Sequence, residues 1–98
     1  MMTNSEKQEI RTIIEMAYMP IALKNNRYNG EDFLKVAFET MKILKAQNPY
    51  IDKFEAAKVM MEFFNSKLNP PMPIDNLIGT AKLIAKYDSF ESLMNQYR

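Results

Sequence analysis

The apolar residues of this chain recur with the spacing of an α-helix, and this periodicity restricts the fold more than any other feature. Near the N-terminus, one helical face carries Ile10, Ile13, Ile14, Ala17 and Tyr18. Apolar and polar residues do not alternate convincingly over five or more positions, as they would in a half-buried strand. With 2 glycines in 98 residues, the chain also has little scope for the tight turns of a sheet. The sequence therefore predicts an all-α fold.

Prolines and asparagines divide this pattern into five predicted helices. Pro20 is expected to end or kink the first helix, because proline disfavours helical geometry in the preceding residue and clashes with the turn before it. The stretches NNRYNG (25–30) and QNP (47–49) separate the next helices. The predicted helices span about residues 5–19, 31–47, 53–67, 73–86 and 89–97. Together they form one compact bundle, a single domain over residues 1–98.

Capping residues mark the predicted helix starts. In a capping box, the N-cap side chain and a carboxylate three residues later each accept a hydrogen bond from a backbone N–H. This spacing occurs at Thr3–Glu6, Asp52–Glu55 and Asp88–Glu91. Asn29 is a further expected N-cap, and Pro73 suits the first helical position, where its missing N–H is not needed. The helix at 53–67 contains VMMEFF (59–64), with one polar residue in six, and is therefore expected at the centre of the bundle.

The composition lacks the residue types that most catalytic and metal sites use. The chain has no histidine and no cysteine, so the commonest general base and the thiol nucleophile are missing. Phosphate-loop and EF-hand motifs do not occur. Most carboxylates stand where helix starts would use them. We therefore expect no enzyme, no catalytic residues, no cofactor and no metal.

Charge and hydropathy narrow the location and the partners. The chain carries 13 Lys+Arg and 12 Asp+Glu, for a net charge of +1, without the basic excess typical of DNA-binding domains. It has no run of about 18 apolar residues that would span a membrane. Its first residues, MMTNSEKQEI, are polar and do not resemble a secretory signal. Together with the absence of cysteine, this predicts a cytoplasmic protein without membrane contact.

The segment LNPPMPIDNL (68–77) is the candidate site. Pro73 and Asp75 are explained as a helix start, and Asn69 with Pro70 as a helix stop. Pro71 and Met72 have no such local role. Methionine is common on surfaces that adapt to partners, so Met72 either forms an exposed recognition knob or packs onto the preceding helix. The predicted partner-binding residues are Pro70, Pro71, Met72, Ile74 and Leu77.

Residues 31–84 resemble a known family. In this span the helix DKFEAAKVMMEFF is followed by NPPMPIDNLIGTAK. This is similar to the small phage proteins that load and inhibit a replicative helicase, in which a helix ending in an aromatic-rich stretch precedes a P-P-x-I turn. The resemblance implies an adaptor that binds the hexameric helicase, restrains it and passes it to an origin-bound initiator.

The resemblance carries over Pro70, Pro71, Ile74 and Leu77, either as structural or as functional residues. One difference concerns the C-terminus. The family has a flexible C-terminal tail implicated in holding the helicase, whereas the residues here end at Arg98, in or just after a predicted helix. The contact made by the tail is therefore not expected from these residues.

The leading expectation is a small non-catalytic adaptor or regulator that binds a larger protein. One alternative is a nucleic-acid-binding regulator of transcription or replication, which would use lysines of the second and third predicted helices. These are Lys35, Lys42, Lys45, Lys53 and Lys58, interleaved with glutamates. The other alternative is a structural subunit that self-associates by pairing VMMEFF with the same run of a second copy.

Overall fold

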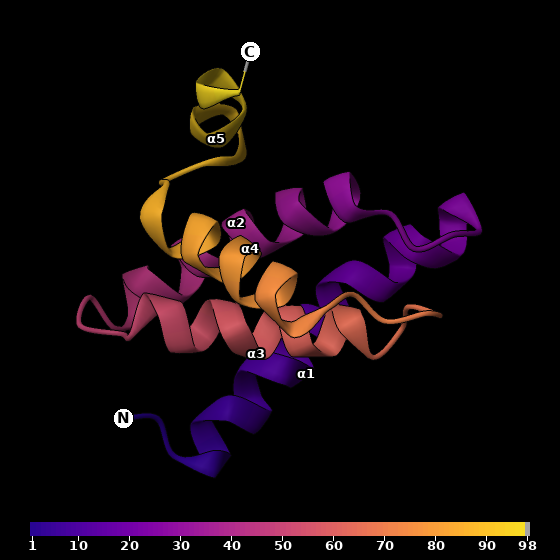
Figure 1. Ribbon diagram of the computed structural model, residues 1–98. Helices are drawn as coiled ribbons and strands as arrows, with labels where there is room; N and C mark the ends of the chain where they lie inside the picture. The colour runs from indigo at the N-terminus through magenta and orange to yellow at the C-terminus, as the bar shows by residue number, and fades with distance from the viewer. Residues whose placement is uncertain (98) are drawn as a thin grey trace.

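The computed structural model describes residues 1–97 and has the expected all-α fold. Within this range it contains helices and no strand (Figure 1). The helices are α1 (Asn4–Asn25), α2 (Gly30–Gln47), α3 (Lys53–Asn65), α4 (Ile74–Lys86) and α5 (Phe90–Gln96). All five predicted helices are therefore present. The boundaries differ most for α1, which is longer than predicted.

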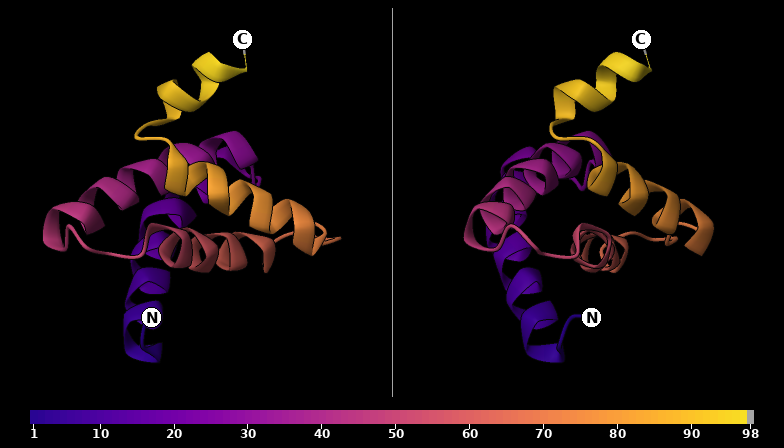
Figure 2. Two further views of the ribbon diagram at one scale, coloured as in Figure 1. Left: turned by 60° about the vertical axis from the view of Figure 1, so that its left-hand side comes forward. Right: turned by 90° about the vertical axis from the view of Figure 1, so that its left-hand side faces the viewer.

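Helix α3 lies at the centre of the bundle, as predicted. It packs against α1, α2 and α4, and the right-hand view of Figure 2 looks nearly along its axis. Its largest buried side chains are Met60, Met61, Phe63 and Phe64, each at most 4% exposed. Each such side chain contributes roughly 1.5–3 kcal/mol when it is fully buried. Because VMMEFF supplies the core, these four side chains are not available to pair with a second copy, and that expectation for the run is corrected.

An aromatic cluster joins α1, α2 and α3. The rings of Tyr18 and Phe33 meet edge to face with centroids 5.2 Å apart, and Tyr18 meets Phe64 in the same way at 5.8 Å. Phe33 and Phe64 are stacked at 4.5 Å. Pairs of this geometry add about 0.5–1.5 kcal/mol beyond their area burial. The cluster therefore fixes how the first three helices meet.

The prediction that α1 ends before Pro20 is wrong. The helix continues through Pro20, which is exposed, to Asn25. Because proline has no N–H, the carbonyl of Met16 lacks its usual donor four residues later. The last turn is held by burial of Ala22 and by Asn26, a left-handed cap residue with φ of 54°. Arg27 N–H also donates to the Ala22 carbonyl at 3.0 Å. These contacts outweigh a proline penalty of about 3 kcal/mol.

Most of the predicted capping interactions form. Thr3 and Glu6 make a complete capping box, in which the hydrogen bonds with Thr3 lower the pKa of the Glu6 carboxyl. Asn29 accepts from the N–H groups of Glu31 and Asp32. The Asp52 carboxylate accepts from Glu55 N–H at 3.0 Å.

Three predicted helix ends need correction. The N-cap of α5 is Ser89 and not Asp88, because the Ser89 hydroxyl accepts from Ser92 N–H at 3.0 Å. Pro73 is the N-cap of α4 and not its first helical residue. Helix α3 ends at Asn65, before the predicted residue 67. Terminal turns differ from sequence expectations most easily, since a single hydrogen bond decides them.

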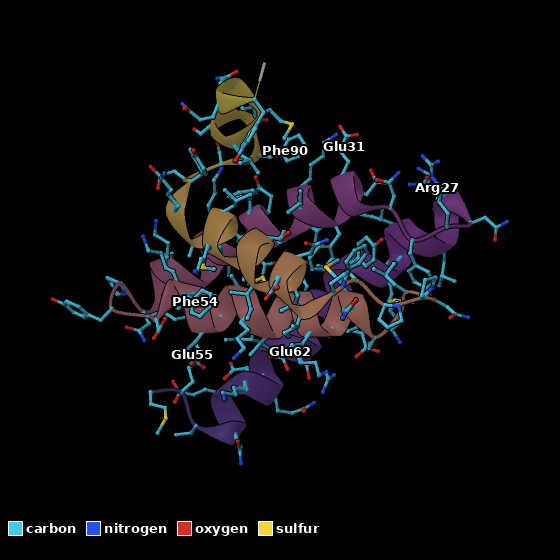
Figure 3. All side chains as sticks on the ribbon, viewed as in Figure 1. Arg27, Glu31, Phe54, Glu55, Glu62 and Phe90 are labelled. Carbon is cyan, nitrogen blue, oxygen red and sulfur yellow. The ribbon has the colours of Figure 1, made fainter. Side chains whose placement is uncertain are left out.

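Helix α5 extends away from the other four helices (Figures 1 and 2). It packs against α2 through Leu93, which is 2% exposed, and through the half-buried Phe90. The Lys35 ammonium lies 5.3 Å from the centre of the Phe90 ring, beside Glu31 at the start of α2 (Figure 3). None of the helices in residues 1–97 combines the length and the apolar character needed to cross a bilayer.

Candidate partner-binding surfaces

The α1–α2 connection is held by the buried side chain of Tyr18. Asn29 N–H donates to the Tyr18 hydroxyl at 2.9 Å, and the hydroxyl donates to the Asn29 carbonyl at 3.3 Å. The ring itself is fully buried. Desolvation raises the pKa of Tyr18, so the neutral phenol is favoured. This connection is thus tied into the core.

The α3–α4 connection contains the predicted site and is held by Asn65. The Asn65 Oδ1 accepts from Met72 N–H at 2.7 Å, and its Nδ2 donates to the Met72 carbonyl at 3.5 Å. The Asn69–Pro70 peptide bond in this segment is cis. Asn65 therefore fixes the backbone of the segment. Sequence reasoning missed this role, because nothing in the pattern links a helix end to a residue seven positions later.

The structure divides the predicted partner-binding residues between surface and core. Pro70 and Pro71 are exposed, and Ile74 is 61% exposed. Met72 is half-buried and packs against the edge of the core, so it is not the freely exposed knob of the first interpretation. Leu77 is 2% exposed. Its assignment as a contact residue is corrected, because the α3–α4 packing covers it.

A shallow depression of about 540 Å³ adjoins the proline segment on the outer side of α4. Its lining is Met72, Asp75, Asn76, Gly79, Thr80 and Leu83. No heavy atom in the described chain lies within 4 Å of the position that a Cβ on Gly79 would take, apart from the adjacent backbone of α4 itself. We call this surface the Gly79 depression. Sequence reasoning missed it, although an isolated glycine inside a helical pattern was the available signal.

A second apolar surface lies where α1 and α2 meet. We call it the α1–α2 seam and define it by Ala17, Val36, Thr40 and Ile43, together with Ile13, which lies one turn before Ala17 on α1. Part of it lines a hollow of about 270 Å³ with Lys35 and Glu39 at its edge. Ile43 is 53% exposed. The apolar stripe predicted on α1 is only partly buried: Ile10, Ile14 and Tyr18 lie in the core, whereas Ala17 is exposed.

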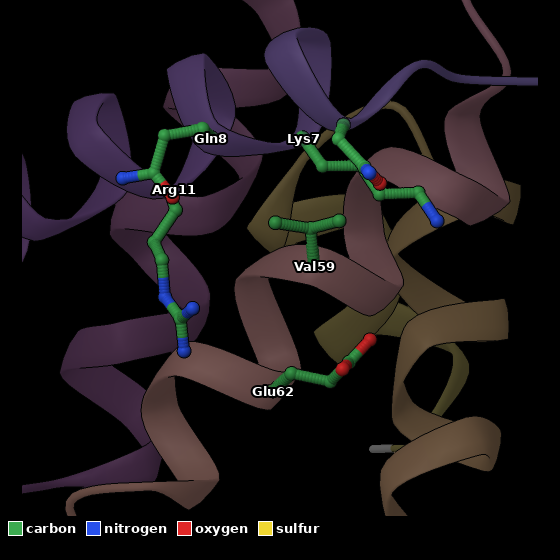
Figure 4. A pocket seen from close by; sticks show the side chains of 6 residues that line it. Lys7, Gln8, Arg11, Val59 and Glu62 are labelled. Carbon is green, nitrogen blue, oxygen red and sulfur yellow. The ribbon is translucent and has the colours of Figure 1, made fainter.

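The groove between α1 and α3 is polar and of mixed charge. It encloses about 300 Å³ between Lys7, Gln8 and Arg11 of α1 and Val59 and Glu62 of α3 (Figure 4). Lys7, at the edge of the groove, also forms an ion pair with Glu55, with an N–O distance of 3.7 Å. Both signs of charge are present and the groups are open to water. The groove therefore selects neither an anion nor a cation.

The lysines of α2 are each paired with a carboxylate. The N–O distances are 3.8 Å for Lys35–Glu31, 3.4 Å for Lys42–Glu39 and 3.8 Å for Lys45–Asp88. These carboxylates reduce the positive charge that a nucleic-acid phosphate would meet on α2. Within residues 1–97, no three carboxylates gather closely enough to hold a metal ion.

Comparison of the chain with protein-family models, with curated proteins and with solved structures gave no match in any of the three.

Proposed function

We propose that this protein is a non-catalytic adaptor that binds a larger protein through the Gly79 depression and the adjoining proline segment. The observation that carries the proposal is Gly79 itself. A glycine inside a helix destabilises it by about 0.5–1 kcal/mol relative to alanine. Apart from the helix's own adjacent backbone, nothing described in the chain approaches Gly79 closely enough to require this residue. A bare stretch of helix backbone there suits the close approach of a partner.

The chemistry of the depression fits a protein surface. Met72 and Leu83 supply an apolar centre, and Asp75 and Thr80 supply a polar edge. Pro70, Pro71 and Ile74 extend the apolar area. A partner side chain lying over Gly79 would be apolar, and a neighbouring basic group would face Asp75. The same carboxylate repels the phosphates of a nucleic acid.

The proposed partner is a hexameric replicative helicase. The support for this choice is the resemblance of residues 31–84 to phage loaders and inhibitors of such helicases, a span that contains the Gly79 depression. The adaptor would then act in the cytoplasm during replication, restrain the helicase and perform no chemistry of its own.

The test uses the purified full chain and the purified replicative helicase of the same cell. Gly79→Leu fills the depression, whereas Gly30→Leu is the matched control. The Cβ position of Gly30 also meets no heavy atom within 4 Å in residues 1–97, apart from the adjacent helix backbone. We expect Gly79→Leu to weaken helicase binding at least about tenfold. The Gly30→Leu variant should bind like the wild type, and both should remain helical.

Two results would contradict the proposal. Equal helicase binding by both leucine variants and the wild type would show that the depression is not the contact. Absence of helicase binding, together with retention on DNA that falls steeply as salt rises, would favour the nucleic-acid alternative.

A further inference from the structure

The outer face of α1 has an ordered charge pattern. Glu6, Ile13, Ala17, Pro20 and Lys24 are spaced three, four or seven residues apart and so lie on one side of the helix. The N-terminal end of this face is acidic, because Glu9 lies beside Glu6, and both line a hollow next to α2. The C-terminal end carries Lys24, and the centre is apolar. The face therefore has an acidic end and a basic end, with apolar residues between them.

Helix α2 continues the apolar middle. Val36 and Ile43 stand on either side of Thr40, which is 2% exposed, and opposite the small side chain of Ala17. Lys35 and Glu39 at the edge are paired within the chain to Glu31 and Lys42. Among residues 1–97, no other helix buries Ile43, which is 53% exposed. The α1–α2 seam is thus an apolar surface, and the charged side chains at its edge form ion pairs within the chain.

We infer that the α1–α2 seam binds the same seam of a second copy, with the two α1 helices antiparallel about a two-fold axis. An axis at the level of Glu15 places Glu6 opposite the partner's Lys24, because these residues are equally far from it in sequence. The same axis places Ile13 opposite the partner's Ala17, a large side chain against a small one. One two-fold therefore satisfies both the charges and the packing, as an isologous interface requires. The contact along α1 would extend about 27 Å.

This self-complementarity favours a second copy of the chain as the molecule that binds the seam. An arbitrary amphipathic helix would match the apolar centre but has no reason to match acidic and basic ends separated by this length. A nucleic acid would be repelled by Glu6 and Glu9. The dimer is independent of the helicase proposal, because the Gly79 depression lies on α4 and away from the seam.

The test measures the mass of the full chain by sedimentation over a range of concentrations. We expect a monomer–dimer equilibrium for the wild type and a monomer for Ile43→Asp. Ile74→Asp is the matched control, since Ile74 is exposed to a similar degree, 61% against 53%. It should still dimerise. Far-ultraviolet circular dichroism and melting temperature confirm that both variants remain folded.

Charge exchange tests the antiparallel arrangement. Lys24→Glu should weaken dimerisation about tenfold at low salt, through two symmetric repulsions per dimer. The double variant Glu6→Lys/Lys24→Glu should restore it, although it loses the Glu6 capping interaction.

A wild-type monomer at millimolar concentration would overturn the inference, as would equal effects of Ile43→Asp and Ile74→Asp. Failure of the double variant to restore association would overturn the antiparallel pairing. Helicase binding by the monomeric Ile43→Asp variant keeps this test separate from that of the proposed function.

Discussion

The α1–α2 and α3–α4 connections are held in the same way but in different surroundings. In each, one side chain of the preceding helix makes two hydrogen bonds to the backbone of a single loop residue: Tyr18 to Asn29, and Asn65 to Met72. Tyr18 is buried within the aromatic cluster, whereas Asn65 is only partly buried. Water therefore competes more easily for the second interaction, whose two residues are both partly exposed, than for the first, whose Tyr18 is fully buried.

The difference explains how a loop can be ordered and still be presented to a partner. The first connection belongs to the core, and its side chains serve the fold. In the second connection, Asn65 holds the backbone of Met72 and the Met72 side chain packs at the edge of the core, while Pro70 and Pro71 remain exposed in a defined position. Pre-ordering of this kind reduces the entropy lost when a partner binds.

The largest predicted effect is on the buried interaction. Tyr18→Phe keeps the ring but removes the hydroxyl that accepts the hydrogen bond from Asn29 N–H. The Asn29 carbonyl still accepts from Phe33 N–H at 2.9 Å. The substitution therefore leaves only one backbone group, Asn29 N–H, without a hydrogen bond. We expect a loss of about 1–3 kcal/mol in the free energy of unfolding, measured with urea. Tyr50→Phe, at a residue that is 94% exposed, should have no effect.

The second prediction concerns Asn65→Ala. Because water can reach Met72, we expect a loss of only about 0.5–1.5 kcal/mol in the free energy of unfolding. Helicase binding should weaken as well, since the proline segment is no longer held. Asn95→Ala, at an exposed residue of α5, serves as the control. A stability loss larger than that of Tyr18→Phe would reverse the comparison between the two connections.

The third prediction concerns Gly79, in the helix that follows the second connection, and tests whether this glycine serves the fold or partner binding. Gly79→Ala should stabilise the fold by about 0.5–1 kcal/mol, because the added methyl group meets no atom of residues 1–97 beyond the helix's own adjacent backbone. A thermal melt measures the gain. A destabilised variant would mean that the glycine serves the fold, and the argument for a binding role would fail.

The smallest effect is confined to alkaline pH. The pKa of Tyr18 is raised above its ordinary value of 10.0 by desolvation. Its neutral form therefore contributes stability that is fully present below the unfolded-state pKa and is lost as pH rises through the folded-state pKa. Urea unfolding from pH 8 upward should show a steeper loss for the wild type than for Tyr18→Phe. Parallel curves would show that the Tyr18 hydroxyl is not desolvated.

The helices could be predicted from sequence because their periodicity and caps are local. The apolar character of VMMEFF predicted the central helix, and Thr3 and Asn29 predicted two helix starts. Pro20 could not be judged in this way, because tertiary contacts beyond it hold the helix together. The competing caps Asp88 and Ser89 differ by a single hydrogen bond, which spacing alone does not resolve.

The candidate site was predicted only in part. The exposed prolines followed from their position between two helices. The interaction of Asn65 with Met72 depends on the path of the loop, and the burial of Leu77 depends on how α4 turns towards α3. Gly79 was visible in the sequence, but its significance came from the empty space around it. Surfaces shared by two helices, such as the α1–α2 seam, require the packing angle before they can be recognised.

The burial of the methionines also separates them by chemical reactivity. Met41, Met60 and Met61 are at most 4% exposed, whereas Met16 is 73% exposed on the solvent side of α1. A mild oxidant would therefore convert Met16 to its sulfoxide well before it reached the core. The product is polar and would lie on α1 beside Ile13 and Pro20, next to the apolar middle of its outer face. Reduction by a methionine sulfoxide reductase would reverse the change, so the redox state of one thioether would adjust this surface while the fold stayed intact.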